Sequence, residues 1–166
     1  SGEIVPVTVT GVRSASPGTA GELRGEFLSD ILGIVTGNDA TGLYGRWTAQ
    51  AQNIGTMLPI AAPGEVHTGD AELWTTLSGR NAQHYTERIE RVGSGGQDAN
   101  RDLPLRITDP ALLSATGGIV QGMSGSPLVQ DGKLVGAVTH VLVGTPAKGY
   151  GIFADTMLKM AETYNQ

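Results

Sequence analysis

Residues 122–140 read Gly-Met-Ser-Gly-Ser-Pro-Leu-Val-Gln-Asp-Gly-Lys-Leu-Val-Gly-Ala-Val-Thr-His. The Asp131-Gly132 pair in this stretch lies between two apolar runs, which is a strong signal for a tight β-hairpin. Gly122 and Gly125 precede the hairpin, and glycine readily adopts the positive φ angles of a sharp turn because it has no Cβ. The stretch therefore predicts a glycine-rich turn that leads directly into a β-hairpin.

Ser124 lies at the centre of this turn. A serine hydroxyl is a poor nucleophile at neutral pH unless a base activates it and an oxyanion hole stabilises the product of its attack. The turn can direct the backbone N–H groups of Gly122 and Ser124 toward one point, where an oxyanion would form. We therefore predict Ser124 as a nucleophile, with these two amides as its oxyanion hole. The alternatives are a plain glycine-rich turn and Ser126 as the reactive serine.

Composition favours a single β-rich unit. The chain has 166 residues, which fits one domain or two small subdomains that share a core. Its 25 glycines, 8 prolines and 16% charged residues suit short strands joined by turns. We interpret the chain as a fragment of a longer parent, because it begins with serine rather than methionine.

Charge and residue types exclude several function classes. A net charge of −5 without a run of Lys or Arg argues against a nucleic-acid partner and a basic membrane face. The absence of cysteine excludes thiol chemistry and cysteine-based zinc sites. The histidines lack the spacing of metal ligands, so we expect neither a metal nor a cofactor. No apolar run is long enough to span a bilayer.

Most of the chain has the pattern of strands and turns. Valine-rich alternation predicts a strand over residues 3–12, and a second apolar run predicts one over 31–36. Residues 71–92 have the pattern of a long hairpin, and residues 103–107 that of a further strand. The polar, glycine-rich segment 93–101 is the candidate hinge between two subdomains.

Two helices are expected late in the chain. Asp109 followed by Pro110 is a typical helix start, with the aspartate at the N-cap and the proline at the first helical position. Residues 154–164 carry apolar side chains at helical spacing, which predicts an amphipathic C-terminal helix.

A serine nucleophile requires a histidine beside it and an acid behind the histidine. His67 and His84 lie in a loop and in the polar half of the long hairpin, where surface side chains are expected. His140 lies on the strand that ends the stretch quoted above. It has three possible roles: contact with the substrate, general base, or packing. Among the acids, Asp109 leads because it lies shortly before the serine turn, although capping a helix would also explain it.

Four segments together resemble the peptidases of the stage IV sporulation protein B (SpoIVB) family. They are Thr116-Gly-Gly-Ile-Val-Gln with the run 122–140, Lys148-Gly-Tyr-Gly-Ile-Phe153, the early run 16–25, and Gly42-Leu-Tyr-Gly45. The resemblance covers nearly the whole chain and is most specific in its last third. It implies that residues 1–166 form one serine peptidase domain. The implied fold is mainly β, a trypsin-like double β-barrel of two β subdomains with short helices, including a C-terminal one.

The resemblance also implies a biological setting. Members of this family are serine endopeptidases of Gram-positive spore formers, and they usually carry a PDZ domain before the peptidase domain. They are secreted across the forespore membrane into the intermembrane space. There they cleave a regulator of an intramembrane protease, which leads to activation of sigma factor K. Members also cleave themselves.

Carried over by position, the family's nucleophile falls on Ser124 and its proposed acid on Asp109. The strand after the hairpin, with Thr139, His140 and Val141, is expected to bind the substrate backbone. The family's histidine lies in a Gly-His motif upstream of the segment that this chain covers, so we expect at most very weak catalysis from the fragment itself. Met123 stands where trypsin has the aspartate that pairs with a freed N-terminus, so activation by that ion pair is not expected.

Rival interpretations predict different roles for the serine. A non-catalytic trypsin-like module would bind peptides without cutting them, and a structural domain would help to assemble a membrane complex. An esterase is a weaker alternative, because the esterase serine lies between a strand and a helix. Here the sequence predicts a hairpin after Ser124.

Overall fold

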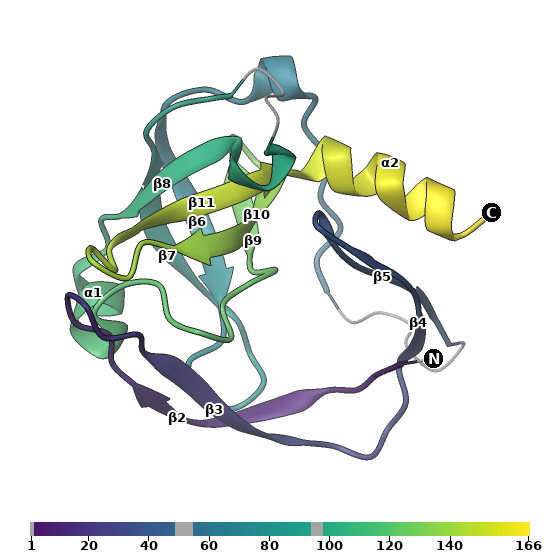
Figure 1. Cartoon of the computed structure of the whole chain (residues 1–166), viewed down its shortest axis with the longest axis horizontal. Coiled ribbons are helices and arrows are strands. Elements are labelled where there is room, and N and C mark those ends of the chain that lie inside the picture. The colour runs from purple at the N-terminus through teal and green to yellow at the C-terminus, as the bar shows by residue number, and fades with distance from the viewer. Residues whose placement is uncertain (1, 49–54, 94–97) are drawn as a thin grey trace.

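A closed six-stranded β-barrel forms the C-terminal part of the molecule (Figure 1). The computed structural model describes residues 2–48, 55–93 and 98–166. The strand order around the barrel is β10-β11-β8-β7-β6-β9. These strands are β6 (Gly69–Thr75), β7 (Gln83–Ile89), β8 (Leu103–Ile107), β9 (Pro127–Gln130), β10 (Lys133–Val141) and β11 (Lys148–Phe153).

Alternating residues of these strands fill the barrel interior, as the two-residue period of a strand requires. Leu73, Leu105 and Leu128, from three different strands, are at most 1% exposed. Burial of one such side chain stabilises the fold by roughly 2 kcal/mol relative to its exposed state. Met123, just before the candidate nucleophile, belongs to the same buried cluster. The barrel core thus extends directly to the serine turn.

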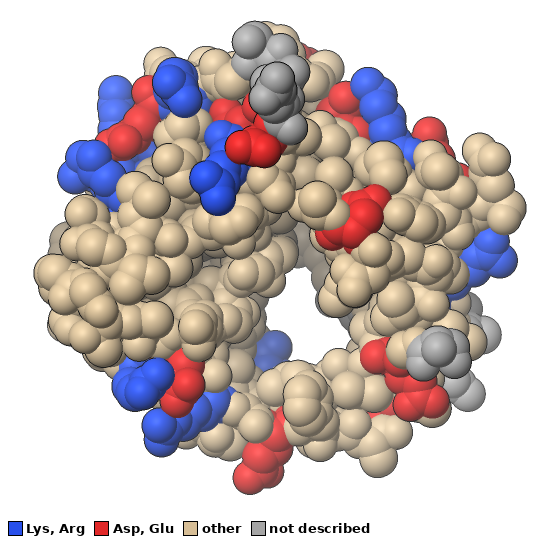
Figure 2. Space-filling view, viewed as in Figure 1, with Lys and Arg blue, Asp and Glu red and all other residues tan. Residues whose placement is uncertain are grey.

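The N-terminal half contributes two smaller antiparallel sheets. One pairs β2 (Val7–Arg13) with β3 (Glu22–Phe27), and the other has the order β1 (Glu3–Ile4), β4 (Gly33–Asp39), β5 (Gly42–Trp47). Figure 2 shows an opening through the molecule, and Figure 1 shows that these sheets and the barrel surround it. The mainly β fold class, with a barrel, further sheets and a C-terminal helix, is confirmed. Among the described residues, the N-terminal sheets do not close into a second barrel.

Two expectations about chain organisation need correction. The strand expected over residues 3–12 is two strands, β1 and β2, which belong to different sheets. Pro6 lies between them and has no N–H for a continuous ladder. The second expectation was a hinge over residues 93–101, and residues 94–97 of it lie outside the described residues. This segment joins β7 to β8, which pair with each other within the same barrel. The segment therefore connects strands of one barrel rather than two subdomains.

The expected hairpins are confirmed. β6 and β7 pair in register from Gly69 opposite Ile89 to Thr75 opposite Gln83. β9 and β10 are joined by Asp131 and Gly132, whose φ angles of 52° and 74° are those of a tight two-residue turn.

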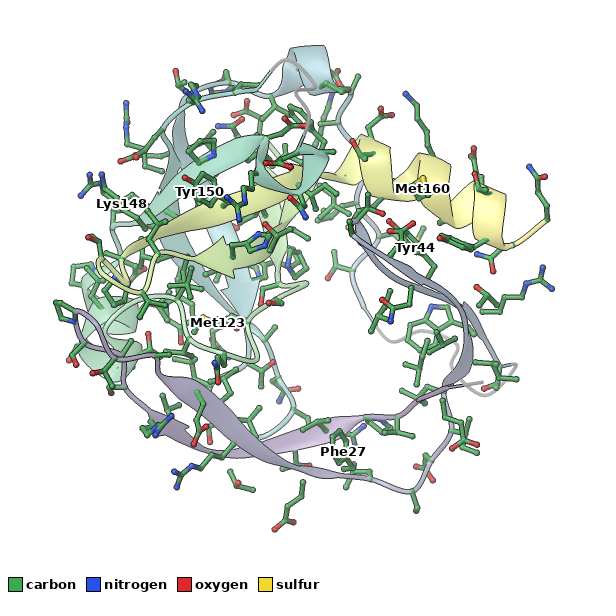
Figure 3. All side chains as sticks on the ribbon, viewed as in Figure 1. Phe27, Tyr44, Met123, Lys148, Tyr150 and Met160 are labelled. Carbon is green, nitrogen blue, oxygen red and sulfur yellow. The ribbon has the colours of Figure 1, made fainter. Side chains whose placement is uncertain are left out.

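Both expected helices are also present. α1 (Pro110–Thr116) begins after Asp109, and Gly117 ends it with a φ of 73°. α2 (Ala154–Tyr164) follows β11 directly and contacts β10 and β5, so it links the barrel to an N-terminal sheet. Figure 3 shows Tyr44 of β5 beside this helix. The ring of Tyr44 stacks on the ring of Tyr164, with the two ring centroids 5.3 Å apart. Short 3₁₀ helices cover Pro63–Glu65 and Ala99–Arg101. In the described ranges, no helix has the length and hydrophobicity needed to cross a bilayer.

Candidate active site

The serine turn, residues 122–126, is held against strand β10 by backbone hydrogen bonds. The Gly125 N–H donates to the Val138 carbonyl at 2.8 Å, and the Val138 N–H donates to the Ser126 carbonyl at 3.0 Å. Within the turn, the Ser126 N–H donates to the Met123 carbonyl at 2.9 Å. Gly122 and Gly125 have φ angles of 99° and 86°, which a residue with a side chain rarely adopts. The two glycines are therefore required by the path of the turn.

The structure distinguishes the two serines of this turn. Ser124 is exposed, and its hydroxyl donates a long hydrogen bond of 3.5 Å to the Thr139 carbonyl. Ser126 is half-buried, and its hydroxyl donates to Thr75 Oγ1 at 3.4 Å. A nucleophile must be accessible and able to leave its resting hydrogen bond. Ser124 meets both conditions better than Ser126.

Two backbone donors of the serine turn are free. In the part of the chain that the structure describes, neither the Gly122 N–H nor the Ser124 N–H donates a hydrogen bond. The Met123 N–H between them is used, because it donates to the Val120 carbonyl at 3.1 Å. An oxyanion hole requires that the amides at these two positions be free to donate. The predicted donors are therefore available for a ligand.

Ser124 lines a pocket of about 540 Å³ between the barrel and the N-terminal sheet that contains β4 and β5. We call it the serine pocket. Its walls are the β4–β5 turn (residues 38–43), Asn100, Ser124 and Gly125, residues 137–140 of β10, Ile152 and Met157. The Asn100 side chain donates to the Ala40 carbonyl at 2.9 Å and so connects the two halves at this pocket.

The predicted substrate strand lies only partly in the serine pocket. Thr139 and His140 line it, whereas Val141 packs against the barrel core. β10 pairs with β9 only as far as Ala137, and a bulge between Val138 and His140 interrupts its pairing with β11. Bulges are common beside active sites, and an unpaired strand edge can accept an added peptide strand. This edge is thus suited to hold a peptide next to Ser124.

None of the three histidines of this chain hydrogen-bonds Ser124. His67 bonds Asp131 at 2.7 Å, and its pKa is raised by hydrogen bonds to the Thr68 carbonyl and then to Asp131. His84 stacks on Trp74 with ring centroids 3.9 Å apart. His140 alone shares the serine pocket, where its Nδ1 lies 3.0 Å from Thr139 Oγ1. These contacts agree with the expectation that His67 and His84 are surface side chains.

The structure does not bring Asp109 to the serine pocket. Its Oδ1 accepts from the N–H groups of Ala111 and Leu112, and its Oδ2 accepts from the Thr86 N–H at 3.0 Å. The Thr86 bond is the main cause that lowers the pKa of Asp109. Both oxygens are thus used in capping α1 and fixing it to β7. In this structure Asp109 has the contacts of a helix cap that is also fixed to β7, and its triad role stays a prediction.

Two substitutions separate these roles of Asp109. We expect Asp109→Ala to lower the free energy of unfolding by about 1 kcal/mol through loss of the N-cap. Asp109→Asn should recover most of that loss, because asparagine also caps helices well. Urea denaturation measures both values, and equal stability of Asp109→Ala and wild type would contradict the capping role. A triad role predicts instead that both variants lose cleavage equally while folded.

One acid that sequence analysis did not single out lies in the serine pocket. Asp39, the last residue of β4, lines it together with Ser124. The only local signal was the Gly-Asn-Asp end of an apolar run, which indicated a turn. Its nearness to Ser124 depends on how the two halves of the chain pack, which no local pattern reports. Among the described residues, no group of three or more His, Cys, Asp or Glu side chains is placed to hold a metal ion.

Residues 1–158 match the family model described as SpoIVB peptidase S55. No match is found among curated proteins.

Proposed function

Because the chain belongs to the SpoIVB peptidase S55 family, we propose that it is the catalytic domain of a serine endopeptidase with Ser124 as its nucleophile. The observation that carries this proposal is the serine turn itself. An exposed hydroxyl lies at the edge of a pocket, on a turn whose Gly122 and Ser124 amides have no partner among the described residues. A plain structural turn has no need of two free amides beside an exposed hydroxyl.

The proposed reaction is acyl transfer. Ser124 Oγ attacks the scissile carbonyl carbon, and its proton passes to a general base. The oxyanion that forms accepts hydrogen bonds from the Gly122 and Ser124 amides, each worth roughly 3 kcal/mol in the transition state. The C–N bond then breaks as the base returns the proton to the leaving amine, and water hydrolyses the acyl-enzyme. By the family resemblance, the base is a histidine of the parent protein upstream of this chain.

The resemblance to this family also supports a proposal for the substrate and the setting of the reaction. We infer that the parent protein acts in the intermembrane space of a sporulating bacterium, where it cleaves a regulator of an intramembrane protease and also itself. This cleavage would lead to activation of sigma factor K. The open edge of β10 beside Ser124 supports a polypeptide substrate, because an extended peptide can add to it as a strand.

A second candidate function is a peptide-binding module without catalysis. It is favoured by one observation, namely that Ser124 has no histidine partner in the described part of the chain. The same pocket and strand edge would then bind an extended peptide and leave it intact.

A fluorophosphonate probe distinguishes the two functions, because it reacts covalently with activated serines. With the full-length parent, we expect mass spectrometry to find the probe on Ser124. Ser126→Ala is the matched control and should be labelled like wild type, whereas Ser124→Ala should not be labelled. Absence of labelling in folded wild type, or labelling that persists in Ser124→Ala, would contradict the catalytic proposal.

A further inference from the structure

Among the described residues that line the serine pocket, Asp39 is the only Asp, Glu, Lys or Arg. It lies at the end of β4, on the N-terminal side of this pocket, while Ser124 and β10 contribute the barrel side. A peptide that occupied the pocket and paired with β10 would therefore have this carboxylate across from the strand edge.

Neutral donors fix the position of this carboxylate. Its Oδ1 accepts hydrogen bonds from the Thr41 N–H at 2.7 Å and the Thr41 hydroxyl at 2.6 Å. Its Oδ2 accepts from the Tyr164 hydroxyl at 2.8 Å, and Tyr164 in turn stacks on Tyr44. The carboxylate is thus held by a rigid aromatic pair and a tight turn rather than free to rotate in solvent.

The carboxylate of Asp39 is charged and has no counter-ion among the residues that the structure describes. The hydrogen bond from the Thr41 hydroxyl, followed by that from the Thr41 backbone, lowers the pKa of Asp39, so it is ionised at neutral pH. No Lys or Arg of the described ranges lies within ion-pair distance of it. Other carboxylates of this chain, such as Glu90 and Glu65, do pair with cations. A half-buried anion beside a ligand site is suited to a cation supplied by the ligand.

We propose that Asp39 determines substrate specificity by binding a lysine or arginine side chain of the peptide, close to the scissile bond. This inference rests on the proposed function, since it assigns the substrate class of the same pocket. A basic side chain would add a charge-assisted hydrogen bond to an oxygen that is already oriented, so little further ordering is required. The remaining walls near it, such as Ala137 and Met157, can contact the aliphatic part of that side chain.

Peptide binding tests the proposal without depending on cleavage. We would use the Ser124→Ala protein and short acetylated alanine-based peptides that carry one lysine at successive positions, each matched by a norleucine peptide. Norleucine keeps the aliphatic part and removes the charge. Calorimetry should find at least one position at which the lysine peptide binds about tenfold more tightly than its norleucine partner.

Substitution of the carboxylate then assigns the effect. Asp39→Asn should remove the difference between lysine and norleucine peptides, whereas Asp30→Asn, an exposed aspartate outside the pocket, should preserve it. Thermal unfolding shows that each variant is folded. Equal binding of both peptides at every position, or an unchanged difference in Asp39→Asn, would overturn the proposal. Failure of the catalytic role of Ser124 would leave these binding differences in place, so the two hypotheses are tested separately.

Discussion

Replacing Ser124 with alanine in the full-length parent protein is expected to lower the rate of peptide-bond cleavage by about 10⁶-fold. The expected loss is large because members of a catalytic triad act as a unit, and removal of the nucleophile leaves only the oxyanion hole and substrate binding. Self-cleavage and cleavage of a peptide substrate should fall together. Gel analysis measures the first, and a fluorogenic peptide measures the second.

Ser126→Ala is the matched control for this experiment. It removes a hydroxyl of the same turn, but one that hydrogen-bonds Thr75 at 3.4 Å. We expect it to retain most of the activity, because the Ser124 hydroxyl and the free amides are untouched. Substantial cleavage by folded Ser124→Ala, or a comparable loss in Ser126→Ala, would show that the nucleophile is misassigned.

Glu87→Gln is expected to stabilise the protein by about 3 kcal/mol at pH 7. Glu87 lies on β7, is 0% exposed, and neither of its carboxylate oxygens has a hydrogen-bond partner among the described residues. Burial, followed by the negative charge of Asp70, raises the pKa of Glu87 to about 8. The barrel therefore keeps this carboxyl protonated at a pH where the unfolded chain would release the proton.

The pH dependence of this effect has a definite sign. Because the pKa of Glu87 is higher in the folded than in the unfolded state, its contribution to stability is fully present below about pH 4.5. This contribution is lost as the pH rises through the folded-state pKa of about 8, and the total loss is about 5 kcal/mol. Glutamine does not ionise, so the stability of Glu87→Gln relative to wild type should increase over this range and then level off.

Urea denaturation of both proteins at pH 4, 6 and 8 tests this prediction. The difference in free energy of unfolding should be small at the lowest pH and largest at the highest. Glu26→Gln, at an exposed position of β3, is the control and should show almost no such difference. A difference between wild type and Glu87→Gln that does not vary with pH would mean that Glu87 is ionised in the folded protein.

Local signals predicted the elements around the serine well. The Asp131-Gly132 turn, the start of α1 at Asp109 and the C-terminal helix each depend on a few adjacent residues, and the structure confirms all three. The glycine-rich turn was predicted for the same reason, because positive φ angles restrict the choice of residue. The free amides at Gly122 and Ser124 are consistent with the oxyanion hole that this turn suggested.

Features that depend on long-range packing were not accessible from sequence. Strand β3 was missed because most of its side chains are exposed, so it lacks the alternation of apolar residues that marks a half-buried strand. The segment 93–101 has the composition of a linker, and only strand pairing shows that it joins neighbours in one barrel. Asp39 and Ser124 come together only because α2 and Asn100 connect the β4–β5 hairpin to the barrel.

The most direct test of the proposed chemistry is a crystal structure of the parent protein with a peptide boronic acid, which forms a covalent adduct with an activated serine. We expect boron to be bonded to Ser124 Oγ, with one boronate oxygen within hydrogen-bond distance of both the Gly122 and the Ser124 N–H. A boronate bonded to another residue, or one whose oxygens make no contact with these two amides, would contradict the assignment of this turn as the catalytic centre.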